Sequence, residues 1–214
     1  MSVDYEKFRN KLLISEGSDS CGKSTTTELL VKHLNENGIP TILTFQPGDS
    51  AWGTEAVFMR SLCKDKRHNL HPMANLFAFL LDRVQQTSKI VQPALDKGLT
   101  VISDRWTFST IAYQLYGKEL INNYGIDQHI ADWLISSALI CREPDMVLYF
   151  SEKINSSRPN DANDNFETAP NDFQSRVDAA YETMFQNGSN WLRVPLGSSA
   201  AETMTNIVTM VGGK

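Results

Sequence analysis

One segment near the N-terminus limits the fold more than any other. An apolar run at residues 12–15 leads into Gly17-Ser-Asp-Ser-Cys-Gly22-Lys23-Ser24-Thr25, and a helical pattern follows. A strand, a tight loop and a helix in this order point backbone N–H groups at an anion, and the helix adds the positive end of its dipole. The spacing Gly-x4-Gly-Lys-Ser is that of phosphate-binding loops, in which the lysine reaches the β- and γ-phosphates and the serine binds Mg²⁺. We therefore expect a nucleoside triphosphate site formed by Gly17, Ser18, Asp19, Ser20, Cys21, Gly22, Lys23, Ser24 and Thr25.

The bulk composition indicates a globular protein without a membrane or nucleic-acid partner. The 214 residues are enough for one domain with a large core, and 41% are hydrophobic and 21% charged. The net charge of −5 comes without a basic block, which argues against a nucleic-acid backbone as the main ligand. There is no apolar run of membrane-spanning length and no signal-peptide pattern at the first residues.

The cysteines and histidines predict neither a disulfide framework nor a metal cluster. Cys21, Cys63 and Cys141 are scattered and odd in number, as in proteins of a reducing cytoplasm, where we expect this chain to reside. The four histidines lack the spacing of metal ligands.

Short apolar runs alternate with helical patterns along the whole chain. The runs at 12–15, 41–45, 99–103, 146–150 and 191–194 have the continuous apolar character of strands buried on both faces of a parallel sheet. Helical patterns cover about 23–37, 54–62, 72–95, 109–115, 126–140, 173–185 and 200–211. We predict an α/β fold: one domain over residues 1–214, with a doubly wound, parallel, five-stranded sheet that binds ligands at the carboxyl ends of its strands.

The polar stretch at 156–165 interrupts this alternation. It is rich in Asn and Asp and almost free of apolar residues, which is typical of a loop. Composition alone leaves open whether this loop serves the site or is a passive part of the surface.

Asp104 and Arg105 directly follow the apolar run of the third predicted strand. In a phosphate-loop sheet an acidic residue at this place holds Mg²⁺ through water, and an arginine suits the oxygens of a phosphate. The alternative is an ordinary surface ion pair. Glu16, just before the loop, is compatible with structural hydrogen bonding or with the metal site.

Phe79 and Arg83 are four residues apart in a long helical pattern and so share one face of a helix. An aromatic plane with an arginine one turn further along could stack on a base and hydrogen-bond to its edge. Phe79 by itself is more typical of core packing.

Five segments together resemble the thymidylate kinases, a family of phosphate-loop nucleoside monophosphate kinases, over nearly the whole chain. They are Glu16-Gly-Ser-Asp-Ser-Cys-Gly-Lys-Ser-Thr25, Thr44-Phe-Gln-Pro-Gly48, Phe79-Leu-Leu-Asp-Arg83, Asp104-Arg-Trp-Thr-Phe-Ser-Thr-Ile-Ala-Tyr113 and Pro144-Asp-Met-Val-Leu-Tyr149. The run Asp-Arg-x3-Ser-x2-Ala-Tyr is the most discriminating.

The resemblance implies phosphorylation of dTMP by ATP with Mg²⁺, in a homodimer with a mobile lid at about 153–168. The catalytic residues it implies are Lys23, Arg105, Asp19 and Arg158, the last as an arginine finger from the lid. The acceptor-binding residues it implies are Asp19, Phe45, Arg60, Phe79, Arg83, Arg105, Thr110 and Tyr113, and the metal-binding residues are Ser24 and Asp104. Among these, Phe79 would stack on the pyrimidine, Arg83 would bond its O4, and Tyr113 would favour deoxyribose.

Several positions depart from the family pattern and leave the acceptor open. The usual Arg-Glu-Pro-Gly-Gly is Phe45-Gln-Pro-Gly-Asp49 here, leucines at 80 and 81 replace small alanines, Ile111 stands near the expected base, and Asn165 replaces an arginine. The acceptor could therefore be another pyrimidine deoxynucleotide, including one modified at C5. A phosphate-loop binding module without transferase activity is the alternative of a different class, whereas a switch GTPase would need an Asn-Lys-x-Asp sequence that the chain lacks.

Overall fold

Five short parallel strands form the centre of the protein, for which a computed structural model describes residues 2–137, 143–153, 162–169 and 171–213. The strands are β1 (Leu12–Glu16), β2 (Thr41–Phe45), β3 (Thr100–Asp104), β4 (Met146–Tyr149) and β5 (Trp191–Arg193), in the spatial order β2-β3-β1-β4-β5. All five predicted strands are confirmed, with bounds that differ by at most one residue at either end.

The central position of β1 fixes where the site lies. β1 pairs with β3 on one side and β4 on the other, and its Ser15 is in register with Asp104 at the end of β3. The segment after β1 and the residues after β3 therefore leave the sheet side by side at its carboxyl edge. A ligand crevice is expected at such an edge in open α/β sheets.

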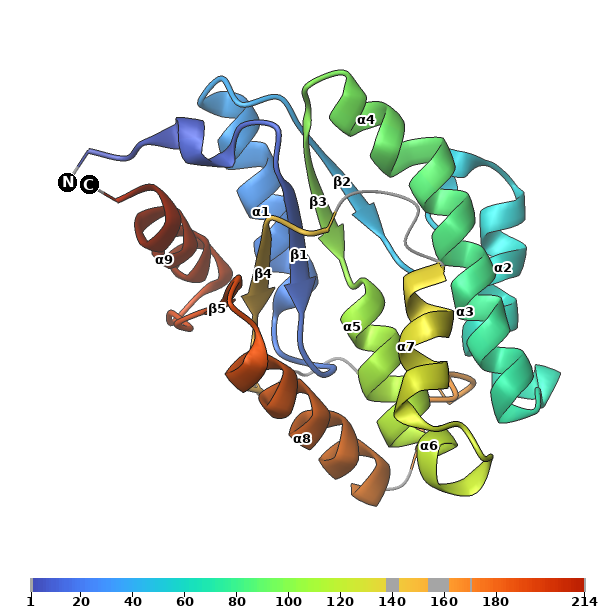
Figure 1. Cartoon of the computed structure of the whole chain (residues 1–214). Helices are drawn as coiled ribbons and strands as arrows, with labels where there is room; N and C mark the ends of the chain where they lie inside the picture. Colours follow the sequence, from blue (N-terminus) through green and yellow to red (C-terminus); the bar gives the residue numbers. More distant parts are fainter. Residues whose placement is uncertain (1, 138–142, 154–161, 170, 214) are drawn as a thin grey trace.

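Side chains alternate between the two faces along each strand, and helices cover both faces of the sheet. Both faces are therefore buried. Leu12 and Ile14 of β1 belong to one core, with residues of the helices α4 (Gln92–Asp96) and α8 (Asn171–Asn187). Leu13 belongs to a second core on the opposite face, under α1 (Lys23–Glu36) and α9 (Ala200–Gly212). Figure 1 shows α9 on one side of the sheet and α8 below its carboxyl end. The continuous apolar runs of the sequence reflect this double burial.

Two predicted helices are present, but part of each has a π-helical winding. The segment predicted at 72–95 forms α3 (Pro72–Gln86), a π-helical turn (Thr87–Val91) and α4. The segment predicted at 109–115 begins as α5 (Thr107–Thr110) and continues as a π-helix (Ile111–Gly117). π-Helical turns are frequent at functional sites, and the second one carries Tyr113.

The remaining helices complete the layers. α2 (Glu55–Lys64) packs on α3, and α7 (Gln128–Ser137) shares a third core with α3 and the second π-helix. The short α6 (Leu120–Asn123) was not predicted, nor were the 3-10 turns Tyr5–Phe8, Ser50–Trp52 and Lys66–His68. Within the described ranges, none of the helices combines the length and apolar character needed to cross a membrane.

Candidate active site

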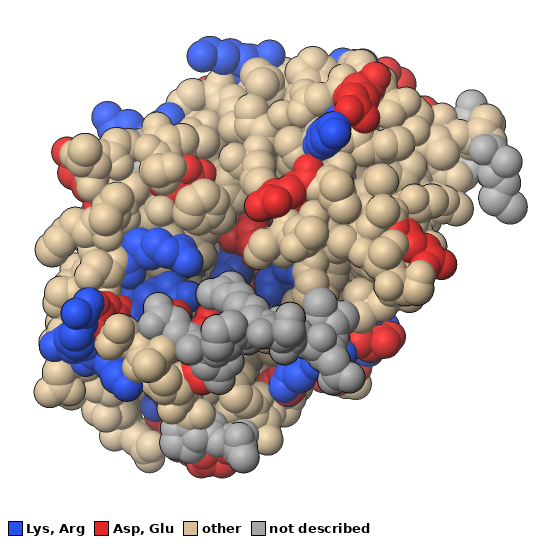
Figure 2. Space-filling view, turned by 180° about the vertical axis from the view of Figure 1, so that it is seen from behind, with Lys and Arg blue, Asp and Glu red and all other residues tan. Residues whose placement is uncertain are grey.

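A cavity of about 720 Å³ lies at the carboxyl edge of the sheet, between the loop after β1 and side chains from β2, α2, α3 and the second π-helix. On the face shown in Figure 2, Lys and Arg side chains gather around a hollow. The basic residues that line the cavity are Lys23, Arg60, Lys64, Arg83, Arg105 and Lys153, and the acidic ones are Asp19, Glu28, Asp104 and Glu167. On a chain of net charge −5, this local excess of positive charge suits phosphate groups.

The loop between β1 and α1 has the geometry that its two glycines permit. Gly17 has φ +143°, and a Cβ atom there would lie 2.3 Å from the carbonyl oxygen of Phe150, so the position accepts no side chain. Gly22 (φ +79°) precedes α1, and no side chain among the described residues caps this helix. Its first N–H groups are thus left to bind an anion.

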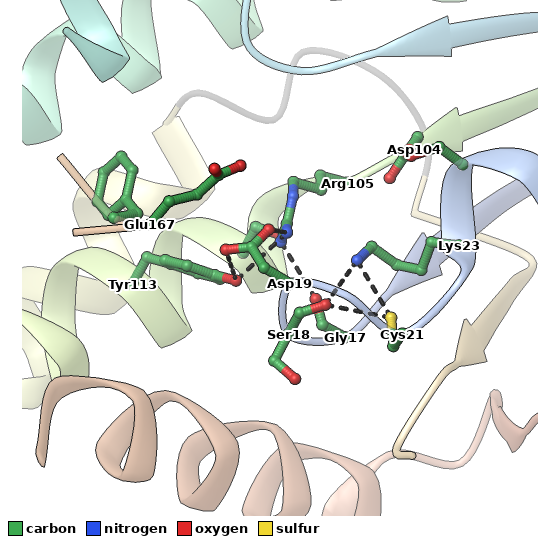
Figure 3. A network of polar contacts seen from close by, with 12 residues as sticks. Gly17, Ser18, Asp19, Cys21, Lys23, Asp104, Arg105, Tyr113 and Glu167 are labelled. Carbon is green, nitrogen blue, oxygen red and sulfur yellow. Dashed lines mark hydrogen bonds and ion pairs between the residues drawn. The ribbon is translucent and has the colours of Figure 1, made fainter. Parts of the chain in front are cut away.

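The Lys23 side chain folds back onto the loop. Its Nζ donates to the carbonyl oxygen of Ser18 at 2.8 Å and to Sγ of Cys21 at 3.3 Å (Figure 3). The cavity is lined by Asp19, Ser20, Cys21, Gly22, Lys23, Ser24 and Thr25, whereas Gly17 and Ser18 lie behind this surface. The carbonyl oxygen of Gly17 accepts from Arg105, and that of Ser18 accepts from Lys23.

Ser24 and Asp104, the two predicted metal-binding residues, lie in contact. The Ser24 hydroxyl donates to Oδ2 of Asp104 at 2.6 Å, and Oδ1 of Asp104 is buried without a hydrogen-bond partner among the described residues. A hydroxyl and a carboxylate are ligands that Mg²⁺ accepts, usually together with water and nucleotide phosphates. The pair fits such an ion, and the described part of the chain contains no cluster of three or more His, Cys, Asp or Glu that would hold a metal without a nucleotide.

Asp19, Arg105 and Tyr113 form a polar cluster beside the loop (Figure 3). Nη2 of Arg105 donates to Asp19 at 2.5 Å, and the Tyr113 hydroxyl donates to the other oxygen of Asp19 at 3.1 Å. Burial acts to raise the pKa of Asp19, but the charges of Arg105, Lys23 and Lys64 outweigh it and lower this pKa to about 2. Asp19 is therefore an anion that can accept hydrogen bonds but cannot serve as a base near neutral pH.

Arg105 is held in an uncommon conformation by many contacts. Its φ of +73° lies in the left-handed region, which non-glycine residues seldom adopt and which recurs at functional sites. Its Nη1 donates to the carbonyl oxygen of Gly17 and to Ser109, and its guanidinium lies 4.9 Å from the ring centre of Tyr113. The side chain thus joins the loop to the π-helix, and it is not the surface ion pair that the sequence left open.

Glu16 has a structural role. Its carboxylate accepts hydrogen bonds from the backbone N–H groups of Trp106 and Ser109 and from the hydroxyls of Ser109 and Tyr181. Burial raises its pKa despite these bonds. Glu16 therefore ties the end of β1 to α5 and α8, and its oxygens are occupied by protein donors instead of a metal ion.

All eight predicted acceptor residues line this cavity: Asp19, Phe45, Arg60, Phe79, Arg83, Arg105, Thr110 and Tyr113. Arg60 donates to the carbonyl oxygen of Pro47 at 3.0 Å and lies 5.8 Å from the ring centre of Phe45. Arg83 is buried and donates to Gln46 and to the carbonyl oxygen of Trp106, each at 2.9 Å. Phe79 and Arg83 do share the helix face that looks into the cavity.

The expectation that Leu80, Leu81 and Ile111 shape the acceptor pocket is wrong. Leu80 and Ile111 pack in the third core, and Leu81 is 58% exposed. Successive residues of a helix differ in direction by about 100°, so the neighbours of Phe79 point away from the face that Phe79 presents. These substitutions give no reason to expect an altered pocket.

Two amide side chains of the site were not predicted. Gln114 is fully buried and lines the cavity, and neither its side-chain oxygen nor its nitrogen has a partner in the described part of the chain. Nε2 of Gln46 is in the same state. A buried amide without partners indicates a ligand or water, since such groups are normally hydrogen-bonded. The signal in the sequence was a single glutamine in the apolar run Ile111-Ala-Tyr-Gln-Leu-Tyr116.

The predicted lid, at 153–168, is described in part. Arg158 and its neighbours lie outside the described residues. Phe166, Glu167 and Thr168 line the cavity, and Figure 3 shows the Glu167 carboxylate pointing in the direction of Arg105. Phe166 contacts Phe79 and Tyr113 at ring-centre distances of 5.9 and 5.5 Å.

A phosphate loop between β1 and α1, with an acidic residue at the end of the adjacent β3, defines a nucleotide-binding protein of the phosphate-loop class. Comparison with known proteins narrows this class. The thymidylate kinase family matches residues 15–207. The chain is 34% identical over 203 residues to a thymidylate kinase of Neorickettsia sennetsu, covering 94% of each chain, and 33% identical over 211 residues to one of Nitrosomonas europaea, covering 95% and 93%. It belongs to the thymidylate kinase family and is an ATP-dependent nucleoside monophosphate kinase, a transferase.

Solved structures agree on the fold. The crystal structure of thymidylate kinase from Ehrlichia chaffeensis superposes with a TM-score of 0.71 at 23% identity, over 94% of this chain and 97% of that one. The structure of thymidylate kinase from Candida albicans gives 0.74 at 22% identity, over 95% and 91%.

Proposed function

We propose that the chain transfers the γ-phosphoryl group of ATP to dTMP, forming ADP and dTDP for nucleotide biosynthesis. The observation that carries the proposal is a single cavity with a phosphate loop at one end and, at the other, an aromatic and cationic pocket suited to a nucleoside monophosphate. Membership of the thymidylate kinase family supports it.

The acceptor phosphate in this proposal lies between Arg60 and Arg105. Both side chains line the cavity, and a guanidinium matches the oxygens of a phosphate. The attacking phosphate oxygen is already anionic, so the reaction needs no general base, in agreement with the low pKa of Asp19. Catalysis is then mainly positioning and neutralisation of charge, supplied by Lys23, Arg105 and Arg158. Mg²⁺, held by Ser24 and Asp104 with the phosphates, would contribute further positive charge.

The base in this proposal stacks on Phe79 with its edge toward Arg83. A guanidinium can only donate hydrogen bonds, so Arg83 favours the C4 carbonyl of thymine or uracil over the C4 amino group of cytosine. The unpartnered amide of Gln114 offers a donor and an acceptor to the same edge, and Thr110 lines the cavity nearby. Tyr113, bonded to Asp19, would exclude a ribose 2′-hydroxyl, while Asp19 would accept from the 3′-hydroxyl.

The proposed lid, residues 153–168, closes over ATP and brings Arg158 to the transferring group. We expect Arg158→Ala to lower kcat by ~10³–10⁵-fold, as for arginine fingers elsewhere, with ATP still bound. Near-normal turnover of this variant would remove the role.

A homodimer is proposed because an apolar surface lies exposed on three adjoining helices. Its side chains are Val57, Phe58, Phe77, Leu81, Ile130 and Trp133, from α2, α3 and α7. Exposed apolar side chains of this size are typical of a protein–protein interface where they form one patch, and we propose that these six do so. Light scattering after size exclusion should give twice the chain mass, and Phe58→Asp should reduce it to the monomer. We place the reaction in the cytoplasm, with which the buried free thiols of Cys21 and Cys63 agree.

The test is ADP release with Mg-ATP and a panel of monophosphates: dTMP, dUMP, 5-hydroxymethyl-dUMP, dCMP, dGMP, dAMP and UMP. The proposal requires the highest kcat/KM for dTMP. Preference for another pyrimidine would change the acceptor, and silence across the panel with ATP still bound would indicate a binding module.

A further inference from the structure

Lys64 is a cavity-lining cation to which nothing above assigns a role. It lies at the end of α2, one helical turn after Arg60, so both side chains emerge from the same helix face. Both line the cavity that contains the phosphate loop, Asp19 and Arg105. The charge of Lys64 also reaches Asp19, since it contributes to the low pKa of that carboxylate.

The ammonium group is held in place by Asp164. Nζ of Lys64 lies 2.6 Å from Oδ2 of Asp164, whose side chain is 6% exposed. The other oxygen of Asp164 accepts from the backbone N–H groups of Phe166 and Glu167. The carboxylate is thus fixed on both sides, and a long side chain that would otherwise sample many rotamers is positioned before any ligand binds.

The backbones of the two segments are joined as well. The N–H of Lys66 donates to Asn163 at 2.9 Å, and the N–H of Asn165 donates to Lys64 at 2.8 Å, which gives an antiparallel bridge between Asp65 and Asp164. Lys64 therefore stands at a rigid junction between α2 and the segment that carries Phe166 and Glu167.

A lysine ammonium has three N–H donors, so the ion pair with Asp164 leaves donors for a ligand. The side chain of Lys64 is 26% exposed, and it shares the cavity wall with Arg60. We propose that Lys64 binds the acceptor phosphate as a third cation beside Arg60 and Arg105, with Asp164 as its positioning residue. This inference rests on the proposed function, because it concerns the acceptor of that same site.

The experiment compares a nucleotide with its nucleoside. Calorimetry measures the binding of dTMP and of thymidine, which lacks the phosphate, to the wild-type protein, Lys64→Met, Lys64→Arg and Lys66→Met. Lys66 is an exposed neighbour that does not line the cavity and serves as the matched control. Thermal unfolding establishes that each variant is folded.

We expect Lys64→Met to weaken dTMP binding about tenfold, in keeping with the loss of one charged hydrogen bond. Thymidine binding should change less than about twofold by the same reasoning, because thymidine has no phosphate to lose contact with. Lys64→Arg should retain most of the dTMP affinity, and Lys66→Met should match the wild type. Unchanged dTMP binding by Lys64→Met, or equal weakening of dTMP and thymidine, would overturn the assignment and leave Lys64 a structural role.

Failure of the proposed function is visible separately. It appears in the wild-type protein as a lack of turnover with dTMP, before any variant is made. In that case, the binding of the monophosphate that the wild type accepts is compared with the binding of its nucleoside, which lacks the phosphate.

Discussion

The two ends of the cavity are built in different ways. The donor end is one continuous stretch, from Asp19 to Thr25 of the phosphate loop, and its expected ligand groups are largely backbone N–H groups at the start of α1. The acceptor end is assembled from side chains of β2, α2, α3 and the second π-helix, which are far apart in the sequence. Arg105 joins the two, since it contacts the carbonyl oxygen of Gly17 and lies against Tyr113.

This difference separates what each end tolerates. At the donor end, Gly17 can take no other residue because a Cβ atom would collide with the backbone of Phe150. At the acceptor end, individual hydrogen bonds hold the groups in place. Arg83 donates to Gln46 and Arg60 to the carbonyl oxygen of Pro47, and the N–H of Gly48 donates to Asp82. A substitution in the phosphate loop should therefore disturb the whole donor end. A substitution at the acceptor end should affect mainly the contact that it removes.

Among the residues that the structure describes, the largest effect is expected for Lys23→Met, which removes the loop's ammonium and keeps the length of the side chain. We expect kcat to fall by ~10²–10³-fold, the usual loss when one preorganised charged donor to a transition state is removed. Calorimetry should show dTMP binding within about twofold of the wild type, which is less than about 0.5 kcal/mol. If Lys23→Met weakened dTMP binding by as large a factor as it lowered kcat, the two ends of the cavity would not be independent of each other.

The second prediction concerns Asp82, whose carboxylate accepts a hydrogen bond from the N–H of Gly48. Burial raises its pKa to about 6, against the opposing effects of the Gly48 N–H group and the Arg83 and Gln86 side chains. The folded pKa is above the ordinary 3.8, so the contribution of Asp82 to stability is present below pH 4 and is lost as the pH rises through 6. At neutral pH the ionised carboxylate costs up to about 3 kcal/mol.

Asp82→Asn cannot ionise, so its stability relative to the wild type should rise between pH 4 and pH 7 by up to about 3 kcal/mol. Urea unfolding at several pH values measures this difference, with Asp96→Asn, the same substitution at an exposed position, as the matched control. If the difference in unfolding free energy between Asp82→Asn and the wild type did not change with pH, Asp82 would not have a raised pKa in the folded protein.

The same contrast explains what the sequence revealed. The strands and the phosphate loop were predictable because their signals are local: an apolar run, two glycines and a lysine at fixed spacing. The acceptor residues came from the family resemblance, and the cavity brings all of them together. The roles of Gln114 and Lys64 were not predictable. Gln114 depends on a π-helical winding that a pattern of period 3.6 does not contain, and Lys64 depends on how the end of α2 meets the segment around Asp164.

The smallest effect, and the sharpest test of the acceptor end, is that of Phe79→Ala. Base–aromatic stacking contributes about 1–3 kcal/mol, so we expect KM for dTMP to rise about tenfold while KM for ATP stays the same. Leu81→Ala is the matched control, because it lies two residues away on α3 and is 58% exposed. Leu81 belongs to the proposed dimer surface, so the steady-state assay is run at a high protein concentration that keeps the proposed dimer together. Both constants should then be unchanged. Phe79 also touches Phe166, so part of the effect could come from loosened packing. Phe79→Leu separates the two causes, because it restores most of the buried volume without a π-face: if stacking dominates, its KM stays near that of the alanine variant, and if packing dominates, it returns toward the wild type.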